Sequence, residues 1–171
     1  MKRLGLWIMG IVFTLALLVL GAYAVGARLP EKHSAEASAF TPNQPPEVVA
    51  ARIRNVETSG MWRRGVSAVV LAREGSSVIF EETGPDGTVT YRRTETVPNA
   101  EIINEIVSEG LPYGGRWTIR IAPAGHGSNV TIREDGFVKP PLFRFLARFV
   151  FGYSGSIDRY LKELAAAGES Q

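Results

Sequence analysis

The sequence predicts an α+β domain that follows a single apolar helix. Three patterns indicate this: an uncharged run at residues 4–27, six segments of alternating apolar and polar residues within 66–138, and helical apolar spacing over 142–164. Short connections between strands favour an antiparallel sheet, and the last helix then forms a second layer on it. The length of 171 residues suits one domain with an appendage.

The uncharged run predicts a membrane-spanning helix. Its 24 residues, LGLWIMGIVFTLALLVLGAYAVGA, extend about 36 Å as a helix, enough to cross a hydrocarbon core of about 30 Å. Trp7 and Tyr23 lie near its two ends, where aromatic side chains favour the membrane–water interface. Because Lys2 and Arg3 precede the run, we expect a single-pass membrane protein with a cytoplasmic N-terminus and an extracytoplasmic C-terminal domain.

A cleavable signal peptide is the alternative interpretation of the same run. Two small-x-small sequences, Ala22-Tyr23-Ala24 and Val25-Gly26-Ala27, resemble cleavage sites. The apolar part of a signal peptide spans about 7–15 residues, so the longer run here favours a retained anchor. The expected organisation is an anchor at 1–28, a short linker at 29–34, a soluble domain at 35–167 and a tail at 168–171.

The soluble part opens with an expected strand from His33 to Phe40, where polar residues alternate with small or apolar ones. A proline-rich break at 41–46 separates it from an expected helix, for which Pro45 and Pro46 suit the first turn. A second short helical turn ends at Gly60, before Met61 and Trp62.

Six further strands and a long helix are expected after that turn. Turn signals such as Gly84-Pro85-Asp86-Gly87 and Tyr113-Gly114-Gly115 separate most of these strands. The expected strands are 66–73, 77–83, 88–97, 102–107, 116–122 and 129–138. The helix is expected to begin after Pro141 and to be weakened at Gly152 and Gly155, because glycine disfavours a helix interior.

Composition excludes several function classes. The chain has 19 Lys and Arg against 17 Asp and Glu, and Lys2 and Arg3 account for the excess, so the soluble domain has no electrostatic footprint for nucleic acid. The absence of cysteine excludes disulfides, a thiolate zinc site and a cysteine nucleophile. His33 and His126 lack metal-site spacing, and no nucleotide-binding loop or nucleophile elbow occurs, so we expect no metal, cofactor or catalytic motif.

The ordered set of segments resembles the SRPBCC (START-like) superfamily, within its polyketide cyclase/dehydrase and lipid-transport-like branch. The resemblance covers roughly residues 33–167 and implies a helix-grip fold, in which a curved antiparallel sheet of about seven strands grips a long C-terminal helix. The segments that carry it are Phe40-Thr41-Pro42, the helix at 45–54, Met61-Trp62, Gly115-Arg116-Trp117-Thr118, the strand at 128–136 and the closing helix at 144–164.

The resemblance also implies a cavity between sheet and helix that holds a hydrophobic or lipid-like small molecule, as curved layers that do not mesh leave such a space. The alternative for each candidate is that it simply fills the core, which aromatic residues do in most domains. The candidate lining residues are Trp62, Phe80, Tyr91, Trp117, Phe137, Phe145 and Phe149.

Ionisable residues decide between binding and catalysis in such a cavity. Arg93 and Glu95 share a strand face with Tyr91, and we expect that face to point outward. Glu134 is expected to be an exposed sheet carboxylate. The favoured function is therefore a membrane-anchored module that binds a hydrophobic ligand. The alternatives are a cyclase- or dehydratase-like enzyme on an apolar ketide or aromatic substrate, which needs an inward-facing ionisable group, and a non-catalytic structural domain with a filled core.

Overall fold

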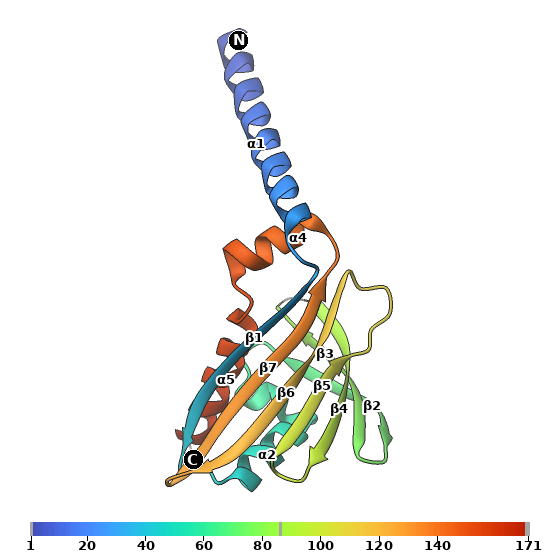
Figure 1. The fold of residues 1–171 in the computed structure, drawn as a ribbon, viewed down its shortest axis with the longest axis vertical. Coiled ribbons are helices and arrows are strands. Elements are labelled where there is room, and N and C mark those ends of the chain that lie inside the picture. The colour runs from blue at the N-terminus through green and yellow to red at the C-terminus, as the bar shows by residue number, and fades with distance from the viewer. Residues whose placement is uncertain (1, 86, 170–171) are drawn as a thin grey trace.

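One seven-stranded sheet curves around a C-terminal helix, and a long N-terminal helix projects from one end of this domain (Figure 1). The computed structural model describes residues 2–85 and 87–169. The projecting helix is α1 (Lys2–Arg28), and the gripped helix is α5 (Gly155–Glu169). The expected tail at 168–171 therefore begins within α5, and its residues 170 and 171 lie outside the described residues.

Six consecutive strands form an antiparallel meander, and the first strand of the domain pairs with the last one at an edge of the sheet. Its order is β1-β7-β6-β5-β4-β3-β2, and every neighbouring pair is antiparallel, as the short turns predict. The predicted α+β fold with about seven strands is confirmed. The strands are β1 (Lys32–Pro42), β2 (Ser67–Glu74), β3 (Ser77–Gly84), β4 (Gly87–Val97), β5 (Glu101–Ile106), β6 (Tyr113–Ala124) and β7 (Gly127–Val138).

One expected turn belongs to a strand instead. Tyr113, Gly114 and Gly115 begin β6 and pair with β7. Glycine at 114 serves close packing here, because a Cβ atom would lie 2.8 Å from Cε1 of Phe137 on the neighbouring strand.

The C-terminal region forms two helical pieces instead of one long helix. The first piece is α4 (Pro141–Leu146), which continues as a π-helical turn, η2 (Ala147–Phe151). Gly152 then takes φ +73°, a left-handed conformation that favours glycine and ends the helical path. Because α5 starts only at Gly155, the expectation of one continuous helix is wrong, and the break falls where the glycines weaken the pattern.

The short helices before β2 cover the other end of the sheet. They are α2 (Pro46–Arg54), η1 (Val56–Thr58) and α3 (Ser59–Trp62), and Pro46 begins the first of them as expected. Because β1 starts beside α1 and its neighbours are antiparallel, the starts of β1, β2, β4 and β6 and the ends of β3, β5 and β7 share one end of the sheet. We call this the α1 end.

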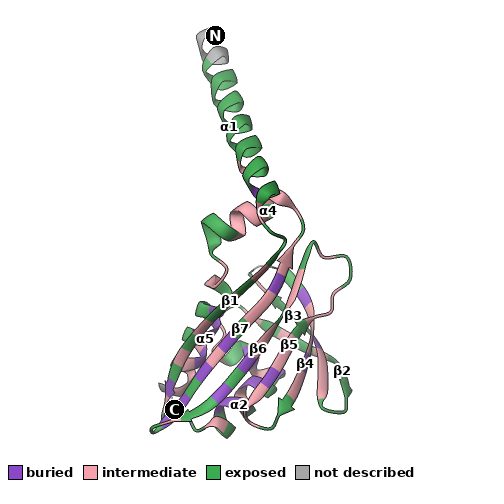
Figure 2. Cartoon of the chain, in the orientation of Figure 1, coloured by how far each residue is buried: buried purple, intermediate pink, exposed green. Residues whose placement is uncertain are grey.

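The hydrophobic core occupies the middle of the sheet and the end away from α1 (Figure 2). Ile102, Ile119 and Ile132 lie side by side on β5, β6 and β7 and are fully buried. They pack with residues of α2 and α5 in a cluster that includes Val49, Ala50, Ile53, Ile157, Leu161 and Leu164. Fully buried aliphatic side chains of this kind supply most of the folding free energy. The core therefore does not extend into the space between the sheet and α5 at the α1 end.

Helix α1 is long and apolar enough to cross a membrane. The stretch Trp7–Arg28 reaches a mean hydropathy of 2.5, and the window that reaches it is not buried against the domain. Three residues, 29–31, separate α1 from β1. Whether the helix spans a bilayer, and which way the domain faces, stays a prediction from sequence.

Candidate functional site

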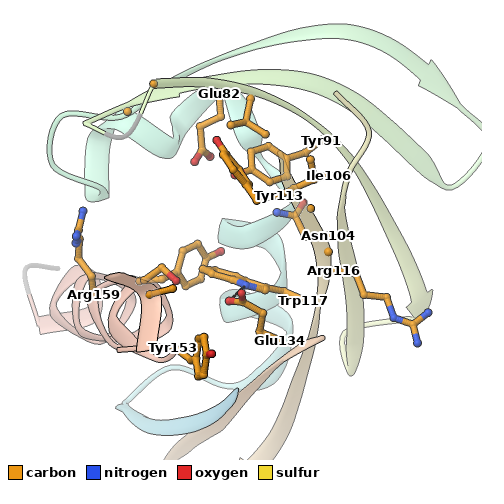
Figure 3. Close-up of a pocket in the computed structure, with 18 of the residues that line it drawn as sticks. Glu82, Tyr91, Asn104, Ile106, Tyr113, Arg116, Trp117, Glu134, Tyr153 and Arg159 are labelled. Carbon is orange, nitrogen blue, oxygen red and sulfur yellow. Dashed lines mark hydrogen bonds between the residues drawn. The ribbon is translucent and has the colours of Figure 1, made fainter. Parts of the chain in front are cut away.

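A cavity of about 350 Å³ lies between the sheet and α5 at the α1 end (Figure 3). Its position follows from the topology, because the core cluster fills the space between the layers only toward the other end. Helix α5 contributes Ser156, Arg159, Tyr160 and Glu163 to the lining. The strand residues of the wall include Val89, Tyr91, Ile106, Tyr113, Phe137 and Val138.

Three aromatic side chains pack together at one wall of the site, and two of them, Trp117 and Tyr160, line the cavity. The ring of Tyr160 makes T-shaped contacts with the rings of Trp62 and Trp117, and the ring centroids are 5.2 Å and 5.5 Å apart, respectively. Tyr160 is 4% exposed, and its hydroxyl has no hydrogen-bond partner among the described residues. Burial raises the pKa of Tyr160, so the hydroxyl keeps its proton. Tyr160 lines the cavity, whereas its hydroxyl is buried and its hydrogen-bonding capacity is unused among the described residues, which is uncommon for a buried polar group.

A carboxylate lies beside the same wall. Glu134 on β7 accepts a hydrogen bond from Trp117 Nε1 at 2.7 Å, and its Oε1 lies 3.2 Å from Nε2 of His33. The imidazole of His33 stacks on the ring of Tyr153, with centroids 4.3 Å apart. Figure 3 shows Glu134, Trp117 and Tyr153 gathered on one side of the cavity. A histidine–carboxylate pair in a cavity is able to move protons.

The expectation that Glu134 is exposed is wrong, since its side chain is 19% exposed and lines the cavity. Trp117 and Glu134 are register partners on β6 and β7, so both side chains face α5. Sequence reasoning also missed His33. The available signal was the alternation along β1, because His33 shares its face with Ala35, Ala37 and Ala39, which pack on the core.

Arg63 and Glu82 bring a largely buried ion pair into the cavity lining. Arg63 binds Glu82 through both guanidinium Nη atoms, with Nη2 to Oε1 at 3.0 Å, and lies over the ring of Tyr160 at 5.0 Å. Burial lowers the pKa of Arg63, but the hydrogen bond and charge of Glu82 outweigh that effect and raise it. Glu82 therefore compensates a largely buried cation at the edge of the cavity.

Arg93 is buried, so the expectation that its face of β4 points outward is wrong. Its guanidinium donates to the carbonyl of Ile53 and to Asn104 Oδ1, and it lies 4.7 Å from the centroid of Phe80. Burial lowers the pKa of Arg93. Glu95, two residues along the strand, pairs with Arg54 at 2.7 Å and lies outside the cavity. These partners come from distant segments, which is why the alternation along β4 did not reveal them.

Three of the seven aromatic candidates line the cavity, namely Tyr91, Trp117 and Phe137. Phe80 is fully buried beneath Tyr91, with ring centroids 5.5 Å apart, and Trp62 packs against Tyr160 at the edge of the core. Phe145 and Phe149 lie on α4 and η2, away from the cavity lining, and Phe149 is 59% exposed. The break at Gly152 explains this difference, because residues before it do not continue the path of α5.

We predict that Glu82→Gln destabilises the domain, because it removes the negative charge that compensates the buried Arg63. The expected loss is about 3 kcal/mol of unfolding free energy. Glu81→Gln is the matched control, since Glu81 is the neighbouring residue and is exposed. Urea unfolding of the full chain in detergent, followed by tryptophan emission, measures both. Equal stability of the two variants would contradict the role assigned to Glu82.

Solved structures share this fold, whereas no protein-family model and no curated protein matches the chain. The di-domain aromatase/cyclase StfQ of the steffimycin pathway has a TM-score of 0.65 and 17% identity over 81% of this chain. This chain spans about half of that protein, 52% of its length. The Zhui aromatase/cyclase from Streptomyces sp. R1128 has a TM-score of 0.67 and 12% identity, covering 81% of this chain and 94% of its own.

A START superfamily protein from Mycobacterium smegmatis has a TM-score of 0.62 and 14% identity, covering 81% of this chain and 98% of its own. Such low identities show the fold alone. The expected helix-grip fold is thereby confirmed: residues 32–169 form a curved antiparallel sheet around a C-terminal helix, as in these solved structures, and the cavity lies between the sheet and that helix.

Proposed function

We propose that the chain is a membrane-anchored binding protein that holds a hydrophobic or lipid-like small molecule in the cavity between sheet and α5. The observation that carries this proposal is the aromatic-walled cavity of about 350 Å³ at the α1 end. A volume of this size lies in the range typical of small-molecule sites, which spans about 300–1,000 Å³. A filled core, the signature of a purely structural domain, would leave no such space.

The lining favours an amphipathic ligand over a purely apolar one. Aromatic and aliphatic side chains offer contact surface for an acyl chain or ring system. The unpaired hydroxyl of Tyr160 and the carboxylate of Glu134 offer hydrogen bonds to a polar group. A molecule with an apolar body and one hydrogen-bonding group therefore fits the cavity best.

The position of the cavity supports a membrane source for the ligand. The cavity lies at the end of the sheet from which α1 projects (Figure 1). With α1 across the bilayer, a lipid-like molecule that leaves the membrane has only a short distance to travel. A retained anchor with a cytoplasmic N-terminus, and an extracytoplasmic domain, complete the proposal.

A second candidate function is acid–base catalysis on the bound molecule. The observation that favours it is the pairing of Glu134 with His33 inside the cavity, at 3.2 Å. Such a pair is able to take a proton from one ligand atom and return it to another, as a cyclase- or dehydratase-like reaction requires. The solved structures of similar fold include two proteins named as aromatase/cyclases.

Filling the cavity tests the proposed binding function. We predict that Ile106→Trp abolishes ligand binding, because the indole occupies space between sheet and α5. Glu105→Trp is the matched control, since the preceding residue is exposed and points to the opposite face. Native mass spectrometry of the full chain, released from detergent after incubation with membrane lipid extract, detects the bound molecule. Absence of any adduct on the unmodified chain and on Glu105→Trp would contradict the proposal.

We predict that Tyr160→Phe weakens binding of the molecule so identified by about two- to tenfold, because one hydrogen bond contributes about 0.5–1.5 kcal/mol. The stability of the unliganded chain is not expected to fall, since the removed hydroxyl has no partner among the described residues. Titration followed by native mass spectrometry measures the affinity, and urea unfolding measures the stability. Unchanged affinity would show that the hydroxyl does not contact the ligand.

Replacing the acidic group separates catalysis from binding. Glu134→Gln keeps the size of the side chain and removes its ability to exchange a proton. If the chain is an enzyme, we expect this variant to retain a molecule that differs from the one that co-purifies with the unmodified protein, either in mass after loss of water or in chromatographic retention and fragment masses after an isomerisation. Molecules identical in mass, retention and fragments would support the binding function alone. Glu36→Gln on the exposed face of β1 serves as the control.

A further inference from the structure

An exposed apolar surface lies beside the base of α1. It consists of Phe143 on α4 and of Phe149, Val150 and Phe151 on η2, which are 55%, 59%, 60% and 69% exposed. We call these four residues the α4 surface. Figure 2 shows that the segment after α4 is largely exposed and that α4 itself lies at the base of α1. Three adjacent large apolar residues open to water are uncommon on a soluble domain and indicate a contact surface.

Helices α1 and α4 are in direct contact. Gly26 of α1 is buried, and a Cβ atom at this position would overlap the carbonyl oxygen of Pro141. The guanidinium of Arg144 also donates to the carbonyl of Leu29 at 2.7 Å, just after the end of α1. The contact therefore sets the height of α4 along the axis of α1.

That height coincides with the edge of the apolar run. Gly26 still belongs to the uncharged segment 4–27, and the interfacial aromatic Tyr23 lies only three residues, or about 4.5 Å of helix, before it. When α1 crosses a bilayer, α4 accordingly lies where the chain leaves the hydrocarbon core. An apolar surface at that level meets lipid instead of water.

We propose that the α4 surface inserts into the interfacial layer of the bilayer that α1 spans, so that the membrane holds the domain at two points. The proposal rests on the membrane-spanning role given to α1 under the proposed function. Charge favours it as well, because Lys139 and Arg148 flank the surface and are exposed, within reach of lipid phosphates. Glu31, an acidic residue near the end of α1, lies 3.9 Å from the guanidinium of Arg144, which offsets its charge.

Insertion would also bring the cavity to the membrane. Ala147 of η2 and Gly152 and Tyr153 after it belong to the cavity lining. The segment that carries the α4 surface is thus one rim of the cavity, and a lipid-like molecule beside it enters without crossing bulk water.

Site-directed spin labelling tests the insertion. The chain contains no cysteine, so single-cysteine variants of the full protein are straightforward. Val150→Cys carries a nitroxide on the α4 surface, and Val69→Cys on β2 is the matched control, since the two valines are 60% and 62% exposed. Leu18→Cys, which is 64% exposed on α1, reports on the anchor itself. Each is reconstituted into vesicles of phosphatidylcholine and phosphatidylglycerol.

Collision rates with oxygen, which concentrates in lipid, and with a water-soluble nickel chelate distinguish the environments. We expect the Val150 label to show a severalfold lower nickel rate and a higher oxygen rate than the Val69 label. A Val150 label that matches the Val69 label overturns the insertion. Low rates with both reagents also overturn it, because they indicate burial against another protein, including a second copy of this chain.

The Leu18 label separates this proposal from the proposed anchor. High oxygen and low nickel rates at Leu18, combined with aqueous behaviour at Val150, reject insertion and leave the anchor in place. Aqueous behaviour at both positions rejects the two together. A Phe149→Cys label repeats the measurement at a second position of the α4 surface, and the tryptophan emission spectrum verifies that each variant is folded.

Discussion

The pairing of β1 with β7 determines how every other part of this molecule is placed. Eleven register pairs, from Lys32 opposite Phe137 to Pro42 opposite Gly127, join the first strand of the domain to the last. As β1 follows α1 and β7 precedes α4, this pairing brings both helices to the same end of the sheet. The cavity lies at this α1 end, and the aliphatic core lies toward the other end.

Buried charge gives the cavity its chemical character. Arg63 and Glu82 compensate each other near the ring of Tyr160, whereas Arg93 relies on neutral acceptors, the Ile53 carbonyl and Asn104. Burying such groups costs free energy unless they are hydrogen-bonded, and both guanidinium groups have hydrogen-bond partners. The cavity lining thus combines aromatic side chains with charged and polar groups, a combination that suits an amphipathic molecule.

The elements were largely predictable because their signals are local. Period-two alternation and glycine- or proline-containing turns located all seven strands to within a few residues, and Pro46 located the start of α2. The facing of the charged residues was not predictable in this way. Glu134 turns inward because Trp117 donates a hydrogen bond to it and His33 lies beside it. Arg93 turns inward because it donates to the carbonyl of Ile53, which is forty residues away in sequence but adjacent in space.

By itself, the sequence determined the α+β class, the succession of the strands along the chain, the apolar segment and the absence of cysteine chemistry, since each depends on composition or on spacing within a few residues. The tertiary structure decided which side chains share the cavity, that Gly152 divides the last helical region, and that Phe149 is exposed and does not line the cavity. These features depend on contacts between distant segments, and no local pattern encodes which segments will meet.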